Sequence, residues 1–247
     1  MPTHNPPWIA EGAPFPAAEL AWGRNSEAPG LLAIGASLDI NTLVNAYSHG
    51  IFPWFSIGQP ILWWSPDPRM ILQPANFKLH PSLRKTLTRF CNNANCEIRV
   101  DSAFEYVINA CASSPRSGQH GTWIVPSMVR AYTDLHHAGF AHSIETWIDG
   151  KLEGGLYCVA VGNTVFGESM FTRSTNASKI ALSALVALCR RHSVGFIDCQ
   201  QNTRHLASLG AGEVPREDFL AHIRQAQKKP GPVWQFSPLY WKHVLSA

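Results

Sequence analysis

Residues 141–200 carry the pattern that most restricts how this chain can fold. Three runs rich in branched and aromatic side chains occupy residues 141–148, 152–161 and 164–171. Only Asp149-Gly150 and Gly162-Asn163 separate these runs, and such pairs between alternating runs are strong signals for β-hairpins. We therefore expect an antiparallel meander of three strands.

A helix and a fourth strand follow this meander. Ala181, Leu185 and Leu188 recur at helical spacing within residues 180–192, and the next run, residues 196–200, has strand character. A strand–helix–strand connection joins parallel strands of one sheet. The meander and the crossover together predict an α+β domain with a mixed sheet.

The two strands joined by this helix carry polar side chains where a core face is expected. Alternation places Phe166, Glu168 and Met170 on one face of the first strand, and Asp198 and Gln200 on one face of the second. A buried carboxylate or amide is costly unless it is paired or used. The polar residues are therefore candidate functional groups, with a purely structural hydrogen-bonding role as an equal alternative.

The N-terminal part of the chain has the features of a separate, smaller unit. Residues 31–34 predict a short strand, and a helix follows that ends near Gly50. Residues 51–69 hold four prolines and three tryptophans, which excludes a regular helix and indicates a domain interface or a pocket wall. We place a small α/β domain at residues 1–67 and a larger domain at residues 68–247.

A cluster of basic residues follows this boundary. Pro81 can open a helix with a buried apolar stripe, and Arg84, Lys85 and Arg89 then lie on its solvent face. An ordinary solvated helix face is the simpler interpretation of this cluster. Contact with a phosphate backbone is the alternative.

Composition excludes several classes of protein. Of 247 residues, 45% are apolar and 15% are charged, with a net charge of +3, which is typical of folded globular chains and not of disordered or membrane-spanning ones. The six cysteines are irregularly spaced without a Cys-x-x-Cys pair, which favours reduced thiols over disulfides or a zinc site. Because the N-terminus has no basic and apolar leader, we expect a cytoplasmic protein without membrane contact.

Ten motifs run in order along most of the chain: Gly30-Leu-Leu-Ala, His49-Gly-Ile-Phe-Pro-Trp-Phe55, Pro60-Ile-Leu-Trp-Trp-Ser-Pro-Asp-Pro-Arg69, Gly121-Thr-Trp-Ile, Ala131-Tyr-x-x-Leu-His136, Gly139-Phe-Ala-His-Ser-Ile-Glu145, Gly167-Glu-Ser-Met-Phe171, Asn176-Ala-Ser-Lys179, Ile197-Asp-Cys-Gln200 and Leu206-Ala-Ser-Leu-Gly-Ala. In this set the chain resembles the bacterial leucyl/phenylalanyl-tRNA–protein transferases. The resemblance implies a small N-terminal domain joined to a C-terminal domain of the N-acyltransferase (GNAT-like) type. It also implies transfer of Leu or Phe, and less well Met, from aminoacyl-tRNA to proteins that begin with Arg or Lys, which marks them for degradation.

The implied reaction asks little of the enzyme beyond positioning. An aminoacyl ester is already activated, so we expect no cofactor and no metal. Separately, we expect the chain to act as a monomer. The acceptor amine must be deprotonated and held close to the ester carbonyl. By the resemblance, Asp198 and Gln200 match the catalytic pair, and Glu168 matches a carboxylate that holds the cationic N-terminus. Whether Asp198 removes a proton or only positions the amine is open.

The resemblance also implies roles for residues around the donor. Trp54 and Trp123 would stack on the terminal adenosine or form the pocket wall, with Tyr132 beside them. The side chain of the donor amino acid needs an apolar pocket, for which Leu156 and Met170 are candidates. The basic residues Arg84, Lys85 and Arg89 would contact the acceptor arm of the tRNA.

Two other functions compete with this one. An acetyl-CoA-dependent N-acetyltransferase needs a glycine-rich turn that holds pyrophosphate at a helix N-terminus, and here Asn176 and Ser178 add bulk to that turn. A non-catalytic adaptor for tRNA or basic N-termini would tolerate replacement of Glu168 or Asp198. An enzyme would lose rate on the same replacements.

Overall fold

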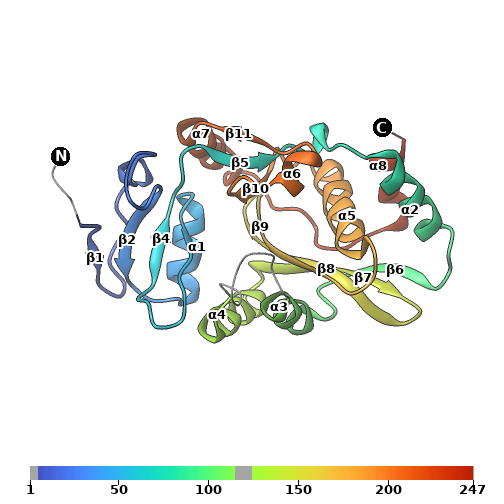
Figure 1. Ribbon diagram of the computed structural model, residues 1–247, viewed down its shortest axis with the longest axis horizontal. Helices are drawn as coiled ribbons and strands as arrows, with labels where there is room; N and C mark the ends of the chain where they lie inside the picture. Colours follow the sequence, from blue (N-terminus) through green and yellow to red (C-terminus); the bar gives the residue numbers. More distant parts are fainter. Residues whose placement is uncertain (1–4, 115–123, 247) are drawn as a thin grey trace.

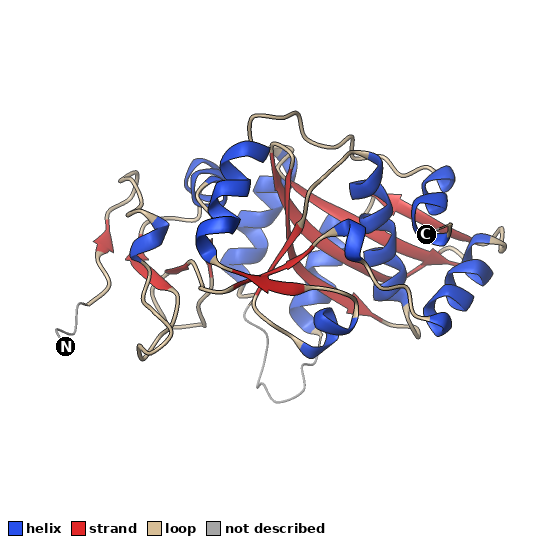
Figure 2. Cartoon of the chain, turned by 90° about the horizontal axis from the view of Figure 1, so that it is seen from above, coloured by secondary structure: helices blue, strands red, loops and turns tan. Residues whose placement is uncertain are grey.

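The computed structural model describes residues 5–114 and 124–246, which form an elongated molecule with a small sheet at one end and a large sheet in its body (Figures 1 and 2). Within these ranges the small sheet has four strands in the order β1-β2-β4-β3. Its elements are β1 (Trp8–Ile9), β2 (Leu31–Gly35), α1 (Ile40–Ser48), β3 (Phe52–Pro53) and β4 (Leu62–Trp64). The strand and helix predicted before Gly50 are confirmed.

The large sheet has seven strands in the described part of the chain, in the order β11-β5-β10-β9-β8-β7-β6. The parallel pair is β9 and β10, joined by the crossover helix α5 (Ala177–Arg191), and the other neighbouring pairs are antiparallel. The predicted hairpins, the crossover and the α+β class with a mixed sheet are therefore confirmed. The strands are β5 (Arg69–Leu72), β6 (Cys96–Val100), β7 (Ala141–Ile148), β8 (Lys151–Val161), β9 (Thr164–Thr172), β10 (Ile197–Gln200) and β11 (Gly212–Val214).

Helices cover both faces of the large sheet. The apolar helix α5 packs on one face, and α3 and α4 pack on the other (Figure 1). None of the helices in the described ranges is long and apolar enough to cross a membrane. The other helices are α2 (Pro81–Cys91), α3 (Phe104–Ser113), α4 (Pro126–His137), α6 (Arg204–Ser208), α7 (Arg216–Ala226) and α8 (Lys242–Leu245), with 3₁₀ turns at Ala18–Leu20, Pro74–Asn76 and Pro238–Trp241.

Strand β9 carries a bulge at Glu168. Gly167 and Ser169 pair with consecutive residues of β8, which leaves Glu168 as an extra residue in the ladder. An extra residue exchanges the two faces of a strand beyond that point. Phe166 therefore lies in the core cluster under α3 and α4, whereas Met170 packs on the α5 side. The prediction that Phe166, Glu168 and Met170 share one face is wrong for this reason.

Strand β10 carries a second bulge, at Cys199. Asp198 pairs with Ile71 of β5 and Gln200 pairs with Met70, so Cys199 is the extra residue. Gln200 has a φ of +60°, a left-handed conformation that is uncommon for residues other than glycine. The prediction that Asp198 and Gln200 point the same way is therefore wrong, whereas the expected adjacency of the two polar strands is confirmed.

The chain passes from the small sheet to the large sheet between Trp64 and Arg69. Arg216, at the start of α7, holds this passage in place. Its backbone N–H donates to Asp67 Oδ1 at 3.1 Å, and its guanidinium donates to the carbonyl of Ser65 at 2.6 Å. Buried residues of both units belong to one continuous core cluster. The predicted domain boundary falls inside this passage.

Candidate active site

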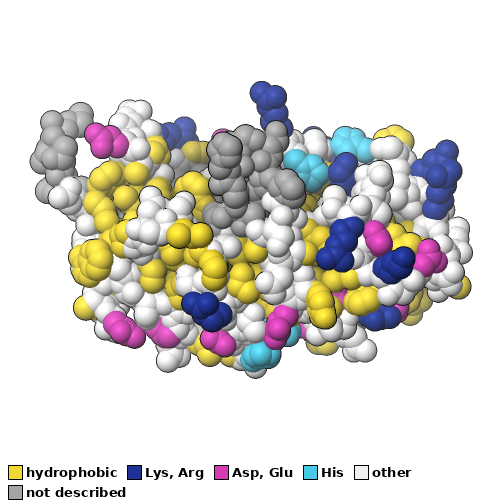
Figure 3. Space-filling view, turned by 60° about the horizontal axis from the view of Figure 1, so that its bottom comes forward, with side chains coloured by type: hydrophobic (Ala, Val, Ile, Leu, Met, Phe, Trp, Pro, Cys, Tyr) yellow, Lys and Arg dark blue, Asp and Glu magenta, His cyan; other side chains and the backbone are white. Residues whose placement is uncertain are grey.

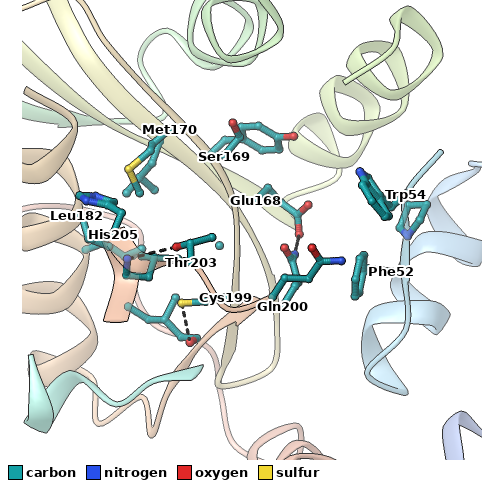
Figure 4. Close-up of a pocket in the computed structure, with 18 residues that line it drawn as sticks. Phe52, Trp54, Glu168, Ser169, Met170, Leu182, Cys199, Gln200, Thr203 and His205 are labelled. Atoms are coloured by element: carbon teal, nitrogen blue, oxygen red, sulfur yellow. Dashed lines mark hydrogen bonds between the residues drawn. The ribbon is translucent and has the colours of Figure 1, made fainter. Parts of the chain in front are cut away.

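A cavity of about 520 Å³ lies where the small sheet faces the bulged strands β9 and β10 (Figure 4). Phe52 and Trp54 line it from the small-sheet side, and Glu168 and Gln200 extend toward each other from the large sheet. Both sheets therefore contribute to one site. The rest of the wall is mostly apolar and includes Leu156, Met170, Leu182, Leu185, Ile197 and Leu206.

Glu168 is the centre of a hydrogen-bond network at the polar end of the cavity. Its Oε1 accepts a hydrogen bond from the Tyr47 hydroxyl at 2.8 Å and another from Gln200 Nε2 at 2.9 Å. The Tyr47 hydroxyl lies 2.5 Å from that of Tyr132. These four residues come from β9, α1, β10 and α4, so the network exists only in the folded chain.

The Glu168 carboxyl is nearly buried and has neutral partners. Its pKa is raised from 4.5 to about 8, mainly by burial; the Tyr47 hydrogen bond opposes this change, and the negative charge of Asp198 adds to it. A carboxyl with that pKa is mostly protonated at neutral pH when the cavity is empty. A bound cation would favour the ionised form. Burial also raises the pKa of the hydroxyls of Tyr47 and Tyr132, which act here as neutral groups.

Asp198 does not reach the cavity. Its two oxygens accept hydrogen bonds from Arg69 Nε at 2.9 Å and Arg69 Nη2 at 2.7 Å, and both side chains are 0% exposed. Oδ1 also accepts a hydrogen bond from the backbone N–H of Gln200 at 2.9 Å. The carboxylate predicted as a base is thus engaged by three protein donors behind the cavity wall.

Arg69 and Tyr47 are site residues that the sequence prediction missed. The Arg69 guanidinium lies between the rings of Phe52 and Phe219, at 4.8 and 4.5 Å from their centroids, and donates to the Gly50 carbonyl at 3.2 Å. The sequence contains one indication that Arg69 is buried, because Arg69 is the first residue of a strand whose other residues are all apolar. A cation buried with such a strand requires a carboxylate partner.

Comparison with known protein families gives two matches that together span most of the site. Residues 71–224 match the family described as leucyl/phenylalanyl-tRNA protein transferase, and residues 36–67 match the N-terminal domain of the same family. This chain belongs to that family. Its cavity draws residues from both matched segments, with Trp54 in the N-terminal one and Glu168 and Gln200 in the other.

Relatives within the family match along nearly the whole chain. A leucyl/phenylalanyl-tRNA–protein transferase from Polaromonas sp. is 65% identical, covering 98% of this chain and 94% of its own length. One from Albidiferax ferrireducens is 59% identical, covering 97% and 94%. Among solved structures, a GCN5-related N-acetyltransferase from Kribbella flavida aligns over 68% of this chain and 58% of its own, with 11% identity and a TM-score of 0.34.

The residues predicted to bind the aminoacyl donor in this family member differ in how far they lie from the cavity. Trp54 lines the cavity and is half-buried, with its ring 5.4 Å from that of Trp64. Leu156 and Met170 form part of the apolar wall. Tyr132 is fully buried behind Tyr47 and does not itself line the cavity. Trp123 lies outside the described residues.

The three basic residues predicted to contact tRNA all lie on α2. Lys85 and Arg89 are exposed. Arg84 is half-buried and its guanidinium donates to the Leu245 carbonyl, so the expectation that it faces solvent is wrong. On the face that carries α3 and α4, Lys and Arg side chains gather toward the end of the molecule that holds α2 and β6 (Figure 3). Asp and Glu side chains lie among them in the same view, so this end is of mixed charge.

Residues able to hold a metal ion are not grouped anywhere in the described ranges, where no three His, Cys, Asp or Glu side chains are suitably placed. All six cysteines are free thiols. Cys199 borders the cavity, and burial raises the pKa of its thiol, which keeps it protonated. The polar groups that line the cavity include the Glu168 carboxyl, the Gln200 and Gln201 amides, the side chains of Tyr157, Ser169 and Thr203, the His205 imidazole and the Cys199 thiol.

Proposed function

We propose that this chain transfers Leu or Phe, and less well Met, from aminoacyl-tRNA to the N-terminal Arg or Lys of acceptor proteins, forming a peptide bond. The observation that carries the proposal is a single cavity in which an apolar wall adjoins the Glu168–Gln200 network, within a chain of this family. The apolar wall fits the donor side chain, and the network fits a cationic acceptor.

The reaction needs no activation step. The acceptor α-amine attacks the ester carbonyl carbon, the C–N bond forms, and the C–O bond to the terminal ribose breaks. The proton lost by the amine is balanced by the one gained by the ribose oxygen. A free α-amine has a pKa of about 8, so roughly one amine in ten is neutral at pH 7. Holding that amine against the ester is the main task left to the protein.

Glu168 and Gln200 are the residues that we assign to the acceptor. A cationic N-terminus that enters the cavity meets the Glu168 carboxyl, and its charge stabilises the ionised form of that group. The Gln200 amide, bonded to the same carboxyl, orients the amine. Asp198 is assigned a supporting role because its carboxylate lies behind the wall.

The donor side chain is assigned to the apolar part of the cavity away from Glu168, and the donor adenosine to the small-sheet wall. Leu156 and Met170 contact the Leu, Phe or Met side chain, and Trp54 stacks on the terminal adenosine, with Trp123 as a second candidate for that role. Tyr132 acts through Tyr47 rather than by touching the donor. Lys85 and Arg89 contact the phosphates of the acceptor arm, whereas Arg84 divides its role between tRNA and the α8 carbonyl.

We further propose that the enzyme acts as a monomer in the cytoplasm, where charged tRNA is available. In support, a single chain supplies both the small-sheet wall and the catalytic strands. Light scattering of the purified protein tests the monomer, which a dimeric mass would contradict.

The test of the function supplies radiolabelled Leu-tRNA together with a peptide that begins with Arg. The expected product is a Leu-Arg peptide. A matched peptide that begins with Asp should remain unmodified, because its acidic side chain brings Glu168 no positive charge with which to pair. Failure to label the Arg peptide, or equal labelling of both peptides, would contradict the proposal.

A further inference from the structure

Arg69 is a buried cation that connects the two parts of the cavity. It is 0% exposed, at the first position of β5. A guanidinium presents five N–H donors in a rigid plane, and here Nε and Nη2 engage both oxygens of Asp198 while Nη1 engages the Gly50 carbonyl. Its guanidinium also lies over the rings of Phe52 and Phe219. Such a bidentate, stacked pair has a single geometry.

The Arg69–Asp198 pair holds the β10 bulge. Asp198 Oδ1, already bonded to Arg69, also accepts the backbone N–H of Gln200. Gln200 is the residue in the left-handed conformation just beyond the bulge. A non-glycine residue keeps that conformation only when its surroundings fix it. The Asp198 carboxylate supplies one such constraint.

The bulge in turn aims a side chain into the cavity. Because β10 departs from strict alternation, Gln200 reaches the cavity, where its Nε2 donates to Glu168. On the other side, Arg69 contacts Gly50 and Phe52, which lie four and two positions before Trp54 in the chain. The Arg69 guanidinium therefore contacts Asp198, which holds Gln200, and also Gly50 and Phe52, which belong to the small-sheet wall.

We propose that Arg69 is a positioning residue for aminoacyl transfer, which acts through Asp198 to aim Gln200 and through Gly50 and Phe52 to place the wall that carries Trp54. The inference rests on the proposed function. In this arrangement Asp198 stays ion-paired throughout the reaction and takes no proton from the acceptor. A merely structural ion pair, and an Asp198 that serves as the base, are the two alternatives.

Arg69→Lys is the variant that separates these possibilities. A lysine keeps the charge but cannot donate in parallel to both Asp198 oxygens, so Gln200 loses its fixed direction. The expected result is a fall in kcat of about 10- to 100-fold with a smaller rise in KM for Leu-tRNA, because the wall that carries Trp54 shifts while Leu156 and Met170 keep their places. Arg190→Lys is the matched control: Arg190 is a half-buried arginine that bonds backbone carbonyls, including that of Pro74, outside the cavity, and this variant should keep its kcat.

The pH dependence of kcat distinguishes positioning from base catalysis. If Asp198 only positions, Asp198→Asn lowers kcat but keeps an acid limb, which moves to lower pH because the Asp198 charge no longer raises the pKa of Glu168. The losses in Arg69→Lys and Asp198→Asn should then be non-additive when combined, because both act through Gln200. Loss of the acid limb in Asp198→Asn, or an unchanged kcat in folded Arg69→Lys, overturns the proposal.

Two further measurements keep the proposal testable. Hydrogen exchange at the Gln200 amide should be faster in Arg69→Lys than in the wild type even if no transfer is detected, and equal exchange contradicts the proposal.

If Arg69→Lys does not fold, Arg69→Met combined with Asp198→Leu removes both buried charges together. This double variant should fold and lose kcat, and wild-type kcat would overturn the proposal. Absence of product with the wild type itself refutes the proposed function and leaves the exchange result to decide on Arg69.

Discussion

Glu168 and Asp198 are two carboxyl groups on adjacent strands, one in the β9 bulge and one just before the β10 bulge, and each is at most 9% exposed, yet their surroundings differ. Asp198 has a guanidinium on both oxygens and lies behind the wall. Glu168 has only a phenol and an amide and borders the cavity, and burial raises its pKa to about 8. Burial alone therefore does not decide the charge of a buried carboxyl; its partners do.

The largest expected effect comes from removing the partner of Arg69. Asp198→Ala leaves a buried guanidinium without its counter-charge, which costs about 3–5 kcal/mol of folding free energy. Urea unfolding of the purified variant measures this loss. Glu168→Ala leaves no cation without its partner, so it should cost less folding free energy than Asp198→Ala. An equal or larger loss in Glu168→Ala would remove the contrast between the two sites.

The second effect concerns activity with the acceptor. Glu168→Gln keeps the shape of the side chain but cannot ionise when a cationic N-terminus binds. Loss of one charged hydrogen bond should lower kcat/KM for an Arg peptide by about 10- to 100-fold. Steady-state assays at fixed Leu-tRNA measure it. A variant with unchanged kcat/KM would show that Glu168 does not meet the acceptor.

The third effect is on stability as a function of pH. Because folding raises the pKa of Glu168 from 4.5 to about 8, the folded state binds more protons than the unfolded state between these pH values. Stability should therefore fall as pH rises through this window, at up to ~1.4 kcal/mol per pH unit from this group. Unfolding measurements from pH 5 to 8 should give a shallower slope for Glu168→Gln. Identical slopes would mean that Glu168 is ionised in the empty cavity.

The smallest expected effect is on the pH dependence of activity and comes from replacing a neutral partner of Glu168. Tyr47→Phe removes the hydroxyl that opposes the rise in the Glu168 pKa. The pH at which kcat/KM for the Arg peptide reaches half its maximum should move upward, with a loss near neutral pH worth about 1 kcal/mol. Tyr240→Phe, remote from the cavity, is the control. A downward shift would show that Tyr47 does not stabilise the ionised carboxyl.

Local pattern was sufficient for most of the fold. Asp149-Gly150 and Gly162-Asn163 favour tight hairpins, and the apolar stripe around Leu185 predicts a helix that buries one side against the core. These are short-range effects, so they can be recognised along the chain. Alternation failed at Glu168 and Gln200 because a bulge inserts one residue without a consistent sequence signal. The sequence thus singled out strands that border the cavity, but it gave the wrong directions for their side chains.

The sequence by itself determined the α+β class, the mixed sheet, the family and the set of polar residues on β9 and β10. Only the tertiary structure decided which carboxyl faces the cavity, because Arg69 and Asp198, like Tyr47 and Glu168, lie more than a hundred positions apart in the chain. The physical reason is that the state of a buried carboxyl depends on the donors that folding brings within about 3 Å of it. The spacing of residues along a strand does not indicate which donors these are.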